Sequence, residues 1–135
     1  MTVQLSTSVR NAELDAIETA IGTSAVLKVR TGAQPATCAA ADSGTALATC
    51  NLPSDWMAVA SGGSKALSGT WQDASADNTG TAGHWRLYAS DGVTCHAQGT
   101  VTLTGGGGDM TVDNTSFAAG QAFTVTAFTL TAGNA

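Results

Sequence analysis

The chain has 135 residues and a mass of 13.4 kDa, and Ala, Thr, Gly and Ser together make up more than half of it. Only 11% of the residues are charged and the formal net charge is −5, so the chain lacks the basic surface that nucleic-acid binding requires. No apolar run approaches the ~20 residues that cross a bilayer, and Met1–Leu5 does not resemble the start of a signal peptide. We therefore expect no nucleic-acid or membrane partner and synthesis in the cytoplasm.

The first predicted element is an amphipathic helix over Ser6–Ile21, which neither Gly nor Pro interrupts. Ser6 is a suitable N-cap, and Gly22 stands where a left-handed C-cap belongs. The apolar stripe is narrow and lined by Ala, so the helix could pack on the core or on a partner. The candidate partner contacts on this helix and on the arm before it are Val3, Gln4, Leu5, Val9, Leu14, Ile17 and Ile21.

After Gly22 the apolar period changes to two, which is typical of strands. We expect a single β domain over 24–135, and we treat 1–23 as a separate arm and helix. The predicted strands are Ala25–Arg30, Thr45–Leu52, Lys65–Gln72, a hairpin of His84–Ala89 and Val93–Thr104, and Gln121–Thr131. In the last strand the apolar face switches, which indicates either a bulge near Thr126 or a strand buried on both sides. The predicted loops are Thr31–Gly44 and the exposed segment Asp73–Gly83.

About seven short strands with regular turn signals predict a mainly β fold, a β-sandwich or jelly-roll-like domain with one N-terminal helix. Large apolar anchors are few, since the chain has three Trp, three Phe and one Tyr. A thin core favours further burial against copies of the same chain or a larger partner. The expected core residues are Leu27, Val29, Leu47, Leu67, Trp85, Leu87, Val101, Leu103, Phe123 and Val125.

The residues that could carry chemistry do not form a catalytic pattern. His84 and His96 lie on the two arms of the predicted hairpin and could meet across the strands, but we interpret them as surface or cross-strand histidines. Asp73 and Asp77 have the spacing of oxygen ligands without the later Glu of a calcium loop, and Asp91 lies in a polar turn. We therefore expect no enzyme activity, no catalytic residue, no cofactor and no metal.

Three cysteines make an odd number, which does not suggest a disulfide framework. Cys38 and Cys50 could flank a loop and pair under oxidising conditions, although spacing cannot establish their distance. We interpret Cys38, Cys50 and Cys95 as small buried apolar residues that stay reduced in the cytoplasm.

Several stretches resemble a family of short virion structural proteins of tailed bacteriophages and prophages. They are Val9–Glu18, Leu27–Pro35, Ala40–Thr45, Gly80–Tyr88, Gly108–Ser116 and the Thr-rich final strand. The resemblance implies a protein of the virion, made in the host bacterial cytoplasm, whose partners are other virion proteins.

Within a virion, three roles are compatible with a small, weakly charged β domain. We favour a capsid decoration or cement protein that binds the major capsid protein and copies of itself and stabilises the shell. The alternative is a tail, neck or fibre-attachment adaptor. A third role, sugar or receptor binding by stacking on Trp56, Trp71 or Trp85, is disfavoured because we expect the core to use most of these aromatics.

Overall fold

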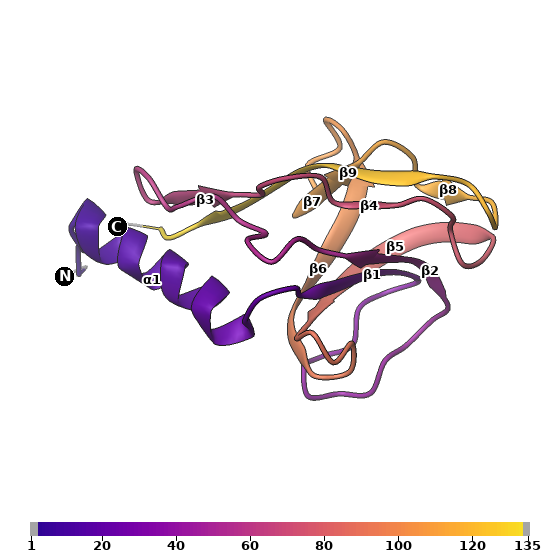
Figure 1. The fold of residues 1–135 in the computed structure, drawn as a ribbon, viewed down its shortest axis with the longest axis horizontal. Coiled ribbons are helices and arrows are strands. Elements are labelled where there is room, and N and C mark those ends of the chain that lie inside the picture. The colour runs from indigo at the N-terminus through magenta and orange to yellow at the C-terminus, as the bar shows by residue number, and fades with distance from the viewer. Residues whose placement is uncertain (1–2, 134–135) are drawn as a thin grey trace.

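The computed structural model describes residues 3–133, and the predicted arm and β domain therefore extend at each end beyond the described residues. The fold is mainly β, with one N-terminal helix and a curled, sandwich-like sheet, as predicted (Figure 1). The elements are α1 (Thr7–Ile21), β1 (Val26–Thr31), β2 (Ala46–Asn51), β3 (Ser64–Ala66), β4 (Gln72–Asp73), β5 (Gly80–Tyr88), β6 (Cys95–Leu103), β7 (Met110–Val112), β8 (Ser116–Phe117) and β9 (Phe123–Thr131).

Helix α1 begins and ends where its capping residues predict. The side chain of Ser6 accepts a hydrogen bond from the Val9 amide at 3.2 Å, which satisfies one of the free donors of the first turn. Gly22 has φ +94°, a conformation that an L side chain would resist, and its amide donates to the Glu18 carbonyl. Both ends of the predicted helix are therefore confirmed to within one residue.

The strands form one sheet in the order β2-β1-β5-β6-β7-β9-β3, with β4 also paired to β9 and β8 to β5. The predicted β5–β6 hairpin is confirmed as an antiparallel pair, whereas β6 and β7 run parallel. On β9, Ala127 pairs with Thr111 and Val125 with Val112, so Thr126 is the extra residue of the predicted bulge. The bulge lets Phe123, Val125 and Phe128 all reach the core.

The predicted strand Lys65–Gln72 and the predicted loop Asp73–Gly83 are both wrong. The first is two short strands, β3 and β4, separated by five residues, and in the second β5 already begins at Gly80. The segment between β4 and β5 closes the curl of the sheet, since Asp73 and Asp77 accept hydrogen bonds from the amide and the hydroxyl of Thr49 on β2. The contacts that close the sheet along this segment leave no hydropathy pattern in the sequence, which explains the error.

The core is built around a chain of aromatic rings. Trp56 packs on Trp71, Trp71 on Phe128 and Phe128 on Trp85, with ring centroids 5.9, 5.4 and 5.2 Å apart. Eight of the ten predicted core residues are buried, and Leu67 is half-buried. The prediction that Leu103 is a core residue is wrong. It is 50% exposed at the end of β6, because Thr104 and the glycines that follow bring no apolar side chain over it.

Candidate partner interface

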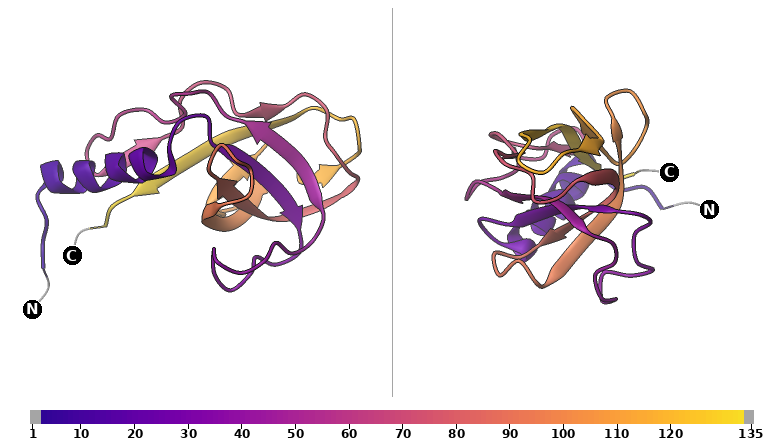
Figure 2. Two further views of the ribbon diagram at one scale, coloured as in Figure 1. Left: turned by 60° about the horizontal axis from the view of Figure 1, so that its bottom comes forward. Right: turned by 90° about the vertical axis from the view of Figure 1, so that its right-hand side faces the viewer.

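Helix α1 extends beyond the curled part of the sheet and lies beside β3 and the C-terminal end of β9 (Figures 1 and 2). Only part of its apolar stripe packs inside the chain. Leu14 and Ile21 are buried, and so they are not available to a partner in this structure. Val9 and Ile17 remain 46% and 39% exposed. The helix is therefore half packed, and its free side is available for contact.

Polar contacts centred on Lys65 hold α1 to the sheet. The buried ammonium group of Lys65 lies 2.7 Å from Asp15 Oδ1 and 2.8 Å from Glu18 Oε2, and it also donates to the Ala58 carbonyl. Burial alone would lower the pKa of Lys65, but hydrogen bonds to the two carboxylates outweigh burial and raise it. The pKa of Asp15 is lowered by the hydrogen bond from Lys65 and by the Ala60 amide.

Three further contacts fix the two ends of the helix. Asn11 Oδ1 accepts from the Gly63 amide at 2.9 Å, and Arg10 donates to the carbonyl of Ala132 beyond β9. At the other end, Trp56 Nε1 donates to the Gly22 carbonyl. Because these partners come from the 56–63 segment and from the end of the chain, the position of α1 depends on the folded sheet.

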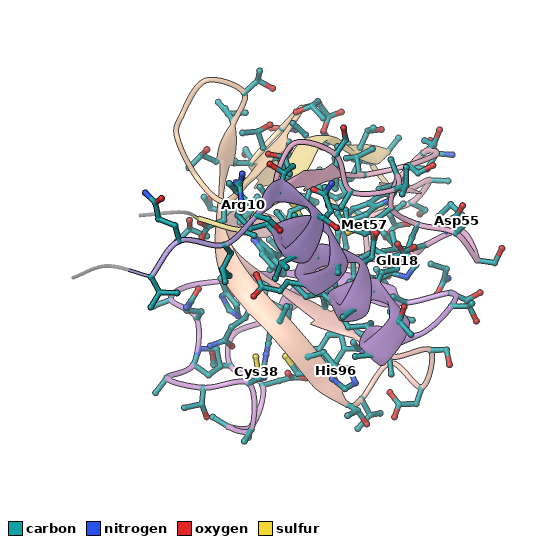
Figure 3. All side chains as sticks on the ribbon, turned by 90° about the vertical axis from the view of Figure 1, so that its left-hand side faces the viewer. Arg10, Glu18, Cys38, Asp55, Met57 and His96 are labelled. Atoms are coloured by element: carbon teal, nitrogen blue, oxygen red, sulfur yellow. The ribbon has the colours of Figure 1, made fainter. Side chains whose placement is uncertain are left out.

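A groove of about 570 Å³ runs between α1 and the 54–59 segment. Figure 3 shows Glu18 and Met57 beside the helix and Asp55 farther out along the same side. Asp15, Glu18 and Asp55 give the groove an acidic lining around the buried Lys65, and Val59 at its edge is 78% exposed. The groove thus combines carboxylates with exposed apolar surface.

The predicted contact residues ahead of the helix have mixed exposure. Val3 and Gln4 are exposed, and Leu5 is half-buried. Of the exposed residues on this side, sequence reasoning named Val9 and Ile17 but not Val59 or Asp55, because a short loop has no periodicity to indicate which side chains it exposes. We call Val9, Ile17, Val59 and the groove residues Asp15, Glu18 and Asp55 the helix-side surface.

A second polar cluster lies on the outer face of β1 and β5, beneath the 32–44 loop. The buried guanidinium of Arg86 donates to Asp42 at 2.5 Å and to the carbonyls of Cys38 and Ala40 in that loop. Arg30 also pairs with Asp42, and the Tyr88 hydroxyl donates to the same carboxylate. Burial by itself would raise the pKa of Asp42, but these partners outweigh burial and lower it.

The two histidines do not come together. His84 is fully buried and faces Thr100 across the β5–β6 pair, whereas His96 is exposed and precedes Thr100 by four residues in β6. His84 Nδ1 lies 2.9 Å from the Gly32 carbonyl, so it anchors the 32–44 loop. The expectation of surface or cross-strand histidines is therefore wrong for His84, because the loop covers an outward-facing position.

The remaining residues considered for chemistry or sugar binding have structural roles. Asp91 accepts hydrogen bonds from Val93 and Thr94, which lower its pKa to about 2. Within residues 3–133, no group of three or more His, Cys, Asp or Glu side chains is placed to hold a metal ion. The indole rings that could have stacked on a sugar are all buried, as expected; they are Trp56, Trp71 and Trp85.

Comparison with protein-family models, with curated proteins and with solved structures finds no match for this chain. Over residues 3–133, no helix is long and apolar enough to cross a membrane. The physical arrangement of the helix-side surface is therefore the main basis for a functional proposal.

Proposed function

We propose that this chain is a structural component of a tailed-phage virion, a capsid decoration or cement protein that docks on the shell through the helix-side surface. The observation that carries the proposal is the half-packed helix α1, which extends beyond the sheet, leaves Val9 and Ile17 exposed, and borders an acidic groove through Asp15 and Glu18. The resemblance of the sequence to virion proteins supplies the setting, and the major capsid protein is the favoured partner.

Exposed apolar side chains on a projecting element are typical of surfaces that become buried on assembly. Val9 and Val59 would each contribute apolar area, while Asp55 and the exposed part of Asp15 would meet basic groups of the partner. A weakly charged β domain adds little other charge, so the contact would be mainly apolar at its centre and charged at its rim. Many copies binding in this way would stabilise neighbouring shell subunits.

The binding test uses particles purified from a host that carries this chain and the purified full-length protein. We expect the Val9→Asn/Val59→Asn double variant to co-sediment with particles at least about tenfold more weakly than the unaltered chain. Val93→Asn is the matched control, because Val93 is as exposed as Val59, at 78%, but lies in the β5–β6 turn. Equal binding by all three proteins would refute docking through this surface.

Deleting residues 1–22 is a weaker experiment, because it also removes the buried Leu14 and Ile21 and uncovers part of the core.

The number of copies per particle separates the two virion roles. A decoration protein follows the symmetry of the shell and reaches on the order of hundreds of copies, whereas a tail or neck adaptor follows a ring of about a dozen or fewer. Quantitative gel staining of purified particles measures this number, and absence from the particle would refute both roles.

A further inference from the structure

The three cysteines occupy different environments. Cys50 is fully buried in the core, where burial raises the pKa of its thiol to about 12. Cys38 lies on the 32–44 loop and Cys95 at the start of β6, and both are half-buried free thiols. Figure 3 shows Cys38 below and to the left of the helix, on the side of the molecule where the 32–44 loop lies. Cys50 is buried in the core on β2, whereas Cys38, with which the sequence had suggested it could pair, lies on the loop that contacts Arg86.

The side chain of Cys38 instead lies near that of Cys95, close enough for the two thiols to interact electrostatically. Both residues line one cavity of about 410 Å³, together with Asp42, Arg86 and Thr94. Arg86 holds both of them, since its Nε donates to Cys95 Sγ at 3.2 Å and its Nη2 donates to the Cys38 carbonyl at 2.7 Å. The loop that carries Cys38 is therefore fixed against the strand that carries Cys95.

We propose that Cys38 and Cys95 form a reversible disulfide site that reacts with low-molecular-weight disulfides such as oxidised glutathione. The cavity gives a small disulfide access to the pair, and the shared cavity and the contacts with Arg86 limit the rearrangement that bond formation needs. Arg86 is a positioning residue for the reaction, because it fixes both cysteines.

The reaction is a thiol–disulfide exchange in two steps. Cys38 loses its proton and attacks one sulfur of the small disulfide, forming a mixed disulfide and releasing one small thiolate. Cys95 then loses its proton and attacks the Cys38 sulfur, forming the protein disulfide and releasing the second small thiolate. The two protein thiols are oxidised, the small disulfide is reduced to two thiols, and the two protons balance the charge.

The order of attack follows from the surroundings of Cys95. Burial raises the pKa of its thiol and outweighs the hydrogen bond from Arg86, which acts in the opposite direction. We assign Cys95 the second step, as the resolving thiol, because burial disfavours its thiolate. Once it ionises, the Arg86 guanidinium at 3.2 Å stabilises its negative charge.

The disulfide would link the 32–44 loop covalently to β6 and hold Asp42 over Arg86 and Tyr88. In the reducing cytoplasm the pair stays open. If the chain leaves the cell within a particle, which rests on the proposed function, the bond would close after release. The chemistry itself depends only on the isolated protein, so its test is independent of particle binding.

Peptide mapping of the purified full-length protein tests the proposal. Trypsin cleavage after Arg30, Lys65 and Arg86 leaves Cys38 and Cys50 on one peptide and Cys95 on another. After native incubation with oxidised glutathione, we expect these two peptides to be linked, also in Cys50→Ser. The link should be absent in Cys38→Ser and Cys95→Ser, and dithiothreitol should reverse it.

A second readout follows folding stability. Oxidation should raise the melting temperature of the unaltered chain and of Cys50→Ser by at least about 4 °C, because the bond restricts the unfolded chain. The other two variants should show no rise. Glutathione adducts without a link, a bond between Cys38 and Cys50, or no reaction would each overturn the proposal.

Discussion

The ammonium group of Lys65 on β3 lies 2.7 Å from Asp15 Oδ1 on α1, and this ion pair is one of the few direct links between the helix and the sheet. Lys65 is buried, whereas Asp15 keeps 41% of its side chain exposed. The pair is therefore asymmetric. The desolvation cost of the buried ammonium group must be offset by its partners, whereas the carboxylate also contacts water.

Replacing Lys65 with Met should destabilise the fold by about 2 kcal/mol, because Asp15 and Glu18 lose a charged hydrogen-bond donor while the apolar stem is kept. Urea unfolding measures the loss, and limited proteolysis should show earlier cleavage within α1. Lys28→Met is the control, since Lys28 is only part-buried and donates to one carbonyl, that of Gly92. A larger loss from Lys28→Met would contradict the role given to Lys65.

The Asp42 carboxylate should make the fold sensitive to acid. Its pKa is lowered on folding, so its contribution to stability is present above the unfolded value of 3.8 and is lost as pH falls through the lower folded value. We expect the urea midpoint to fall as the pH drops below about 4. Asp42→Asn should already be less stable by about 2 kcal/mol at pH 6, because Arg86 stays buried without its anion.

Comparing Asp42→Asn with the unaltered chain separates the contribution of Asp42 to the acid transition from the contributions of the other carboxylates. Asp15 and Asp91 also have lowered pKa values, so Asp42→Asn should retain part of the acid transition and not all of it. An unchanged dependence of the midpoint on pH in Asp42→Asn would show that Asp42 does not contribute.

Cys50 gives a prediction on the alkaline side. Its thiol pKa rises from 9.0 to about 12 on folding, so above pH 9 the unfolded chain ionises first and folding loses stability. The loss should approach about 1.4 kcal/mol per pH unit between pH 9 and pH 10.5. Cys50→Ala, measured by urea unfolding at the same pH values, should be less stable near neutral pH and should show a shallower decline. Parallel declines in the two proteins would contradict this assignment.

Apolar pattern and capping predicted the helix, the burial of the tryptophans and the bulge at Thr126, because these depend on neighbours close in sequence. The prediction that Trp85 and Leu87 face the core is confirmed, and alternation along β5 then places His84 and Arg86 on the opposite face. Alternation could not show that the 32–44 loop folds back over that face and buries both side chains, because the loop consists of small residues without an apolar anchor.

The helix-side surface was predicted in part for a related reason. The stripe of Leu14, Ile17 and Ile21 indicated an amphipathic helix, but spacing alone does not say which members of a stripe meet the chain and which meet a partner. That division depends on Lys65, whose contacts with Asp15 and Glu18 set the rotation of α1 on the sheet. Contacts between residues about 50 positions apart have no local sequence signal.

Gly83 tests whether the 32–44 loop is held closed by close backbone packing. Arg30 pairs with His84 and Thr31 with Ala82, so Gly83 is the unpaired residue of a bulge in β5. A Cβ at this position would overlap the Gly32 carbonyl, the group that His84 Nδ1 contacts. Gly83→Ala should therefore shift the start of the loop and cost roughly 1–3 kcal/mol.

Displacing the loop should also make Cys38, which lies on the loop, and the neighbouring Cys95 more accessible to solvent. We expect a fluorescent maleimide to label Cys38 and Cys95 several-fold faster in Gly83→Ala than in the unaltered chain, with the buried Cys50 labelled last. Gly133→Ala is the control, since a Cβ at Gly133 would meet nothing within 4 Å. If Gly83→Ala matches Gly133→Ala in both urea midpoint and labelling rate, close packing of Gly83 on Gly32 does not hold the loop, and the Arg86–Asp42 cluster must hold it alone.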